Sequence, residues 1–381
     1  MAIGLMSSFL MRLVNPSIVM FNMGMTVIVV LVMQSLVWGL TSLLQRMVFG
    51  ESDLSELARQ LRRIEKDYLS CELTPTQKAK PGLVSYIKEK LIQPALQDYY
   101  ADFAYMGSAY EFTSVPGSSD FDIQVFLKVP STRQNRVKAT AIPSGDPDWM
   151  RVRGGPENLL NYEGYFCPIK ARQLVTSKID RALQANGFQI SFQGFPAVVR
   201  RSTHGPATTL DVTWREEKLS IDIVVCLRKI DLQCSNYDLV GKPYLDKDFW
   251  RQSYAEEELA KLRGYHYSFM RKSLLLRIMK VIKNHHPQMR MFASYFYKNV
   301  LFMLDARNPT ASWGRADLAN RFIDMINLIH QVLSDRSLPL HFNSKVNYLA
   351  NKSPTSISTV ANYLGDIIKK GNYSSLLDRV P

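Results

Sequence analysis

The hydrophobic pattern near the start of the chain differs from that of the remainder. Residues 18–44 are mostly apolar and contain no Asp, Glu, Lys or Arg. A helix of about 20 apolar residues spans a bilayer, so this stretch is long enough. Arg12 precedes it and a larger number of basic residues follow it, beginning with Arg46, and flanks rich in Lys and Arg face the cytosol. We predict one transmembrane helix at about 18–44, inside an N-terminal membrane anchor (1–50).

The positive flank predicts that the part after the anchor faces the cytosol. The sequence does not identify the membrane, and the mitochondrial outer membrane and the endoplasmic reticulum are the two candidates. A cleaved signal peptide is disfavoured because the apolar run is long and no clear cleavage site of small residues follows it.

Helical spacing of apolar residues resumes after the anchor. It predicts one helix over 52–73 and a second over 83–105, separated by 74–82, a segment with two prolines and a glycine. The second helix has an apolar stripe that recurs at Ile87, Leu91, Leu96 and Tyr99. It runs directly into Gly107-Ser108.

Four segments rich in β-branched and aromatic residues predict strands, at 121–129, 188–202, 207–214 and 218–230. The last two are separated by a short polar turn and predict a β-hairpin. Further on, amphipathic spacing predicts helices at 271–284, 291–305, 315–335 and 355–370. The pattern therefore predicts an α/β (α+β) protein, with spine helices and a mixed β-sheet core (51–250) before a helical domain (251–381).

Charge and cysteine content narrow the choice of partners. The chain has 47 basic and 34 acidic residues, a net charge of +13, which favours polyanions such as nucleic acids, nucleotides or acidic lipids. Its four cysteines are widely spaced, with no Cys-x-x-Cys pair. This argues against a disulfide framework and against a cysteine-rich zinc site.

Three aspartates on predicted strands are the candidate chemical centre. Asp120 and Asp122 flank a phenylalanine, so both point to one face of their strand. Asp222 lies among β-branched residues on a later strand, where burial without a partner would cost several kcal/mol. Carboxylates in this number suit Mg²⁺ or Mn²⁺, whose charge relieves their repulsion. Asp211, on the first strand of the hairpin, is a rival third ligand that spacing does not exclude.

Gly107 and Ser108 precede these acids by about a dozen residues. Glycine permits close approach to the backbone, and exposed amides together with a hydroxyl can hold a phosphate. A Gly-Ser pair is a common turn by itself. Its place before Asp-Phe-Asp on a strand favours an enzyme of phosphoryl or nucleotidyl transfer. In such enzymes two metal ions activate the attacking hydroxyl and stabilise the leaving oxygen.

Three segments carry a resemblance to a known family: GSAYEFTSVPGSSDFDIQVFLKVP, HGPATTLDVTWREEKLSIDIVVCL and WRQSYAEEE. They resemble cyclic GMP-AMP synthase, its animal cyclic GMP-AMP synthase-like receptors and the wider Mab-21 family, over about residues 81 to 350. The resemblance implies a DNA polymerase β-like nucleotidyltransferase fold with a helical C-terminal lobe. It further implies a Mg²⁺- or Mn²⁺-dependent enzyme that makes a cyclic dinucleotide from ATP and/or GTP in innate immune signalling.

The resemblance also assigns residues. Asp120, Asp122 and Asp222 match the catalytic, metal-binding triad, which selects Asp222 over Asp211; the family's first acid is usually glutamate, one methylene longer than Asp120. The nucleotide-binding positions match Gly107, Ser108, Arg251, Ser253, Lys280, Ser294 and Tyr295. Of these, Ser108 would contact the donor triphosphate, and Arg251 the acceptor base.

Two departures bear on the partners. The segment 254–280 has no cysteine, so no structural zinc is expected and the zinc element with which the vertebrate sensor grips DNA is absent. The basic residues are then compatible with double-stranded RNA as an activating ligand. The sequence leaves undecided whether the chain forms a homodimer. The membrane anchor is the second departure. It favours an alternative, a catalytically inactive, membrane-anchored nucleotide-binding adaptor resembling the mitochondrial dynamics proteins.

Overall fold

The computed structural model describes residues 51–70, 73–128, 138–141, 147–202, 207–229, 237–242, 248–267, 271–309 and 311–380. The transmembrane helix predicted at about 18–44 lies outside these residues. Among the helices that are described, none is both long enough and apolar enough to cross a bilayer. The chain divides at Leu57 into two compact units, and the sheet, the candidate site and the helical lobe belong to the second, Ala58–Pro381. The predicted domain boundaries at 50 and 250 stay predictions.

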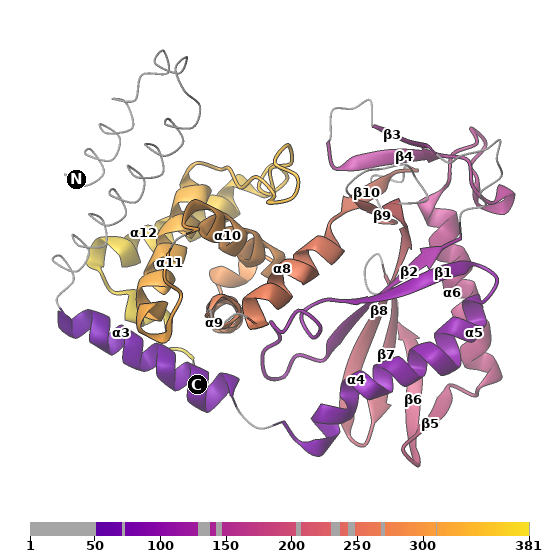
Figure 1. Cartoon of the computed structure of the whole chain (residues 1–381), viewed down its shortest axis with the longest axis horizontal. Coiled ribbons are helices and arrows are strands. Elements are labelled where there is room, and N and C mark those ends of the chain that lie inside the picture. The colour runs from indigo at the N-terminus through magenta and orange to yellow at the C-terminus, as the bar shows by residue number, and fades with distance from the viewer. Residues whose placement is uncertain are drawn as a thin grey trace. The chain divides into compact units, whose positions relative to one another are not determined.

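A mixed β-sheet dominates the part of this unit that precedes the C-terminal helices (Figure 1). Among the described residues it has ten strands, which are β1 (Tyr100–Met106), β2 (Asp120–Leu127), β3 (Lys138–Ala141), β4 (Trp149–Arg153), β5 (Gln189–Phe192), β6 (Phe195–Ser202), β7 (Thr208–Trp214), β8 (Glu217–Leu227), β9 (Asp238–Val240) and β10 (Trp250–Ser253). Their order is β3-β4-β10-β9-β8-β7-β6-β5, and β2 joins β8 and carries β1 on its other side. The β2–β8 pair is parallel, whereas the other pairs are antiparallel.

The predicted hairpin is confirmed as β7 and β8. Its turn consists of Arg215 (φ 46°) and Glu216 (φ 66°), both in the left-handed region. A two-residue turn with two positive φ angles has the twist that suits a hairpin, although glycine and asparagine are the usual residues there. Trp214 and Glu217 close the ladder on either side of the turn. The hairpin fixes the register of β8, and therefore the position of Asp222.

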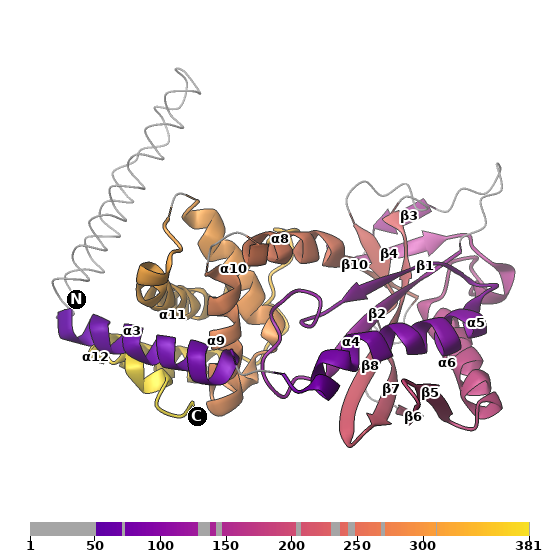
Figure 2. The same cartoon turned by 60° about the horizontal axis from the view of Figure 1, so that its bottom comes forward.

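Helices α4 (Pro75–Ile87) and α6 (Pro168–Ala185) run along one face of the sheet (Figures 1 and 2). Apolar side chains from both helices join the inward-facing residues of β2 and β8 in one core, including Ile87, Val175, Ile123 and Ile223. Burial of such side chains contributes about 1.5–3 kcal/mol each. The opposite face of β2 and β8 is the one that carries the aspartates.

The C-terminal part is a helical lobe. In the described residues its α-helices are α8 (Ala255–Tyr267), α9 (Lys272–His285), α10 (Ser294–Arg307), α11 (Leu318–Ser334) and α12 (Pro354–Lys370). Earlier in the chain, α3 (Glu51–Arg63) and α5 (Gln93–Leu96) accompany α4 and α6. The four helices predicted from 271 onward are confirmed as α9 to α12. The additional helix, α8, was missed.

The structure corrects the prediction for 74–105. The segment 74–82 does not break a helix but begins one, because Thr74 caps α4 reciprocally with Gln77 and Pro75 occupies the first turn. The helix predicted to continue to Tyr105 ends at Leu96, and Tyr100–Met106 is strand β1. Aromatic residues favour a strand there once β2 offers a pairing edge. The short strands β3, β4, β9 and β10 were also missed.

Candidate active site

The strand register brings the aspartates together. In the parallel β2–β8 pair, Asp122 lies directly opposite Asp222, and Asp120 lies opposite Ser220. Side chains alternate along β2, so Asp120 and Asp122 point away from the core that holds Phe121. All three carboxylates therefore share one face of the sheet, near the N-terminal end of β2.

The register also separates Asp211 from this group. Asp211 lies on β7 opposite Ser220, whose hydroxyl donates to its carboxylate at 2.8 Å. Strand β8 stands between β7 and β2, so Asp211 is two strand spacings, about 10 Å, from β2. Asp222 is the carboxylate adjacent to Asp122.

Gly107 places the turn that is predicted to bind a nucleotide against Asp122. It follows the last residue of β1, Met106, which pairs with Asp122, so the turn succeeds a strand and not the predicted helix. Gly107 has φ +82°, and a Cβ atom there would lie 1.9 Å from Oδ2 of Asp122. Only glycine permits this approach. Ser108 is half-buried in the same turn, and its carbonyl accepts the amide of Thr113 at 3.1 Å.

The carboxyl group of Asp122 has a raised pKa. Burial raises its pKa to about 6, and the charges of Asp222, Glu111 and Asp120 act in the same direction, whereas Lys298 lowers it. Like charges that share a site disfavour ionisation. A perturbed titratable group of this kind is typical of functional sites.

The residues fit a divalent cation in charge and chemistry. Three carboxylates on one face supply the oxygen ligands that Mg²⁺ or Mn²⁺ prefers, and a cation would relieve the repulsion felt by Asp122. Among the described residues, no group of three or more His, Cys, Asp or Glu side chains is close enough to hold a metal ion as it stands. The acids have local contacts instead: Thr209 donates to Asp222 at 2.6 Å, and Asp122 lies against Gly107.

The predicted acceptor-base residues lie on the far side of β9. Strand β10 carries Arg251, whose Nε forms an ion pair with Asp148 at 2.5 Å, and Ser253. The charge of Arg251 acts on Tyr295 of α10, and Tyr295 donates its hydroxyl to Glu258 at 2.8 Å. Arg251 and Tyr295 are therefore close enough for the charge of the arginine to affect the tyrosine hydroxyl.

Lys280 and Ser294 take local partners. The ammonium group of Lys280 is buried and donates to the carbonyl and hydroxyl of Thr113, at 2.9 and 2.8 Å. Burial lowers its pKa to about 8. Ser294 lies at the start of α10 and accepts from Lys283 at 3.5 Å. The predicted nucleotide contacts of both residues stay predictions.

Sequence reasoning missed several charged residues at the site. Lys298 bridges Glu111, which follows the Gly107 turn, and Glu258 of α8, at 2.7 and 3.0 Å. Lys242 is a second missed cation: burial lowers its pKa, and Arg251 and Asp122 act on it electrostatically. An isolated lysine or glutamate gives no signal of its burial in the sequence alone.

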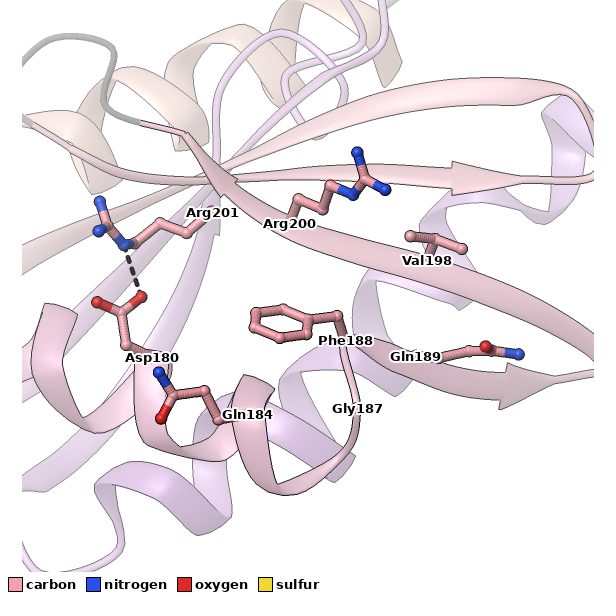
Figure 3. A pocket seen from close by; sticks show the side chains of 8 residues that line it. All are labelled: Asp180, Gln184, Gly187, Phe188, Gln189, Val198, Arg200 and Arg201. Carbon is pink, nitrogen blue, oxygen red and sulfur yellow. Dashed lines mark hydrogen bonds and ion pairs between the residues drawn. The ribbon is translucent and has the colours of Figure 1, made fainter.

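A separate hollow of about 580 Å³ lies at the edge of the sheet (Figure 3). In Figure 3 the Phe188 ring points towards the helix that carries Asp180 and Gln184, and Arg201 of β6 is ion-paired with Asp180 at 2.6 Å. None of the predicted site residues lines it. It is distinct from the aspartate site.

Comparisons with known proteins identify the two parts of the chain. Residues 109–264 match the Mab-21 protein nucleotidyltransferase domain, and residues 271–366 match the Mab-21 protein HhH/H2TH-like domain. Together these matches span well over half of the chain.

Individual relatives are more distant. The chain is similar to a cyclic GMP-AMP synthase-like receptor of Ctenocephalides felis, 24% identical over 298 residues, covering 64% of this chain and 67% of the relative. A receptor of the same description from Tribolium castaneum is 23% identical over 354 residues, covering 81% and 87%. Mitochondrial dynamics protein MID51 of Danio rerio is 25% identical over 256 residues, covering 65% of this chain and 50% of that protein.

Proposed function

Because this chain belongs to the Mab-21 family and contains its nucleotidyltransferase domain, we propose that it is a metal-dependent enzyme that makes a cyclic dinucleotide from ATP and/or GTP. The observation that carries the proposal is the register that sets Asp122 beside Asp222, with Asp120 on the same face and Gly107 against Asp122. This arrangement gathers the acids and the phosphate-binding turn that nucleotidyl transfer needs.

In this proposal the chain's own residues bind and orient two nucleotides. The amides and hydroxyl of the Gly107-Ser108 turn hold the donor triphosphate. Arg251 and Ser253 contact the acceptor base, and Tyr295 stacks on it. Asp120, Asp122 and Asp222 hold Mg²⁺ or Mn²⁺, which supplies charge stabilisation for the attacking and leaving oxygens. Bringing the acceptor hydroxyl to the donor phosphate in this way supplies much of the rate enhancement through orientation.

The test uses the purified full chain with ATP, GTP, CTP and UTP and with Mg²⁺ or Mn²⁺. Parallel reactions contain double-stranded RNA, double-stranded DNA or no polymer, and dinucleotide products are identified by mass spectrometry. The product is expected to disappear in an Asp120→Ala, Asp122→Ala double variant. An Asp211→Ala variant is the matched control, since it removes an exposed carboxylate from the same face without touching the triad. Loss of product in both variants would contradict the assignment.

Two further elements of the proposal concern place and activation. Residues 18–44 anchor the enzyme in a membrane with residues 51–381 on the cytosolic side, because the basic flank follows the apolar stretch. Double-stranded RNA is the activator in this proposal, since the net charge of +13 favours a polyanion. Fractionation of cells that express the full chain tests the first element, and the polymer arms of the reaction test the second.

Similarity to MID51 favours a second candidate function, a catalytically inactive nucleotide-binding adaptor on a membrane. An adaptor should bind a nucleotide with little need for Mg²⁺, whereas the enzyme should require the cation. Nucleotide binding without any product, under every metal and polymer condition, would support the adaptor in place of the enzyme.

A further inference from the structure

The turn that carries Gly107 and Ser108 is attached to the helical lobe at several points. Arg263 of α8 donates to the carbonyl of Tyr110 at 3.3 Å, and Arg277 of α9 donates to the carbonyl of Ser114 at 2.9 Å. Phe112 has φ +56° and stacks on His266 of α8, with ring centroids 4.2 Å apart. An aromatic residue in the left-handed region is strained, and such a conformation persists when surrounding contacts enforce it.

A buried polar network continues this attachment toward the acids. Lys280 donates to the Thr113 hydroxyl at 2.8 Å, and that hydroxyl donates to Glu111 at 3.4 Å. The other oxygen of Glu111 accepts from Lys298 at 2.7 Å. Lys298 also donates to Glu258 at 3.0 Å. The chain of contacts thus joins the turn to three helices of the lobe, α8, α9 and α10.

Lys298 occupies the centre of this network. Its side chain is 12% exposed, and those of its two partners are 7% exposed. Burial acts to lower its pKa, but the carboxylates of Glu258 and Glu111 outweigh burial and raise it. Removing the cation would leave two buried carboxylates without a countercharge, each with one hydroxyl donor, from Thr113 and Tyr295. Loss of one partner of a buried ion pair is strongly destabilising. The contact therefore holds only while the turn and α8 keep their present separation.

We propose that Lys298 is a positioning residue for the nucleotide site: by locking Glu111 to Glu258, it fixes the Gly107-Ser108 turn before a nucleotide binds. Lys298 needs no contact with substrate for this role, because it acts through Glu111, four residues after Gly107. The position of the helical lobe then sets the geometry of the phosphate-binding turn. The inference rests on the proposed function in that it takes this turn as the donor site.

Hydrogen–deuterium exchange of the full chain tests the lock without requiring any turnover. The amides of Glu111 and Thr113 donate to the carbonyls of Gly107 and Ser108 and report on the turn. In Lys298→Met they should exchange about tenfold faster than in the wild type, as expected when local opening becomes easier. Lys298→Arg keeps the charge and should restore most of the protection.

Lys272→Met is the matched control. Lys272 is equally buried in an ion pair with Asp305 at 2.5 Å, but that pair lies within the lobe and does not contact the turn. It should lower stability without speeding exchange at Glu111 and Thr113 selectively. Equal exchange at the turn in Lys272→Met and Lys298→Met would overturn the inference. If Lys298→Met does not fold, Glu111→Gln breaks the same contact more gently and should loosen the turn in the same direction.

Nucleotide binding completes the test. A loosened donor turn should raise the Kd for ATP, and the KM where a product forms, by about tenfold in Lys298→Met with a smaller change in kcat, the pattern of lost binding. An unchanged Kd together with unchanged exchange would also overturn the inference. If no product forms in the wild type but the turn loosens as expected, the proposed enzymatic function fails while the positioning role stands.

Discussion

Asp122 is expected to reduce the stability of the folded chain at neutral pH, and Asp122→Asn should therefore stabilise it. The ordinary pKa of 3.8 rises to about 6 in the fold, chiefly through burial and then through Asp222, Glu111 and Asp120. At neutral pH the folded chain therefore holds an ionised carboxylate in surroundings that disfavour its charge. Asparagine has the same shape without the charge, so it keeps the approach to Gly107 and removes the repulsion.

The magnitude follows from the rise in pKa. A tenfold change in proton affinity is worth about 1.4 kcal/mol, so the rise from 3.8 to about 6 corresponds to about 3 kcal/mol. Because the folded pKa lies above the unfolded value, the folded state binds more protons between about pH 4 and pH 6. The wild type therefore loses stability relative to Asp122→Asn as the pH rises through that window. Above about pH 6 the difference should be constant.

Urea unfolding in metal-free buffer at pH 4 and pH 7.5 measures this difference. The variant should gain up to about 3 kcal/mol over the wild type at pH 7.5 and little at pH 4. Asp211→Asn serves as the control, since Asp211 is exposed and surface changes usually fall within about 0.5 kcal/mol. A variant that is no more stable than the wild type at pH 7.5, or equally stabilised at both pH values, would refute the electrostatic reasoning. Mg²⁺ should stabilise the wild type more than the variant.

Two other predictions concern backbone and acid sensitivity. Gly107→Ala should destabilise the chain by more than Gly117→Ala in urea unfolding: both glycines have φ near +80°, but a Cβ at Gly107 would meet Asp122 at 1.9 Å and one at Gly117 would meet nothing within 4 Å. Equal losses would show that the close approach is not limiting. Burial lowers the pKa of His286, whose ring is hydrogen-bonded to the carbonyl of Leu376. The unfolded chain therefore binds a proton more readily at this residue, and the free energy of unfolding should fall as the pH drops below 6.5. The fall in Tm from pH 7.5 to pH 5.5 should be smaller in His286→Gln.

Local patterns in the sequence were enough to place several elements of the fold. The hairpin of β7 and β8 and the helices α9 to α12 follow from alternation and helical spacing, which depend only on neighbours along the chain. The same reasoning failed for Tyr100–Met106, because a short segment of mixed aromatic and polar residues suits either a helix or a strand. The edge offered by β2 decided that segment.

At the candidate site too, local alternation predicted part of the arrangement and contacts between strands decided the rest. Alternation alone places Asp120 and Asp122 on one face, but Asp211 and Asp222 alternate equally well on their strands. The β2–β8 register, a contact between strands about a hundred residues apart in the chain, sets Asp222 beside Asp122 and leaves Asp211 beyond β8.

The sequence by itself determined which aspartates were candidates for the site and which face of its strand each would occupy, because residue type and alternation along a strand are local properties. The tertiary structure alone decided that Lys298 is buried. On an amphipathic helix a lysine is usually solvated, and this one meets Glu111 and Glu258, which lie 187 and 40 residues away. Contacts at such separations depend on how the sheet and the helical lobe pack, which no local pattern encodes.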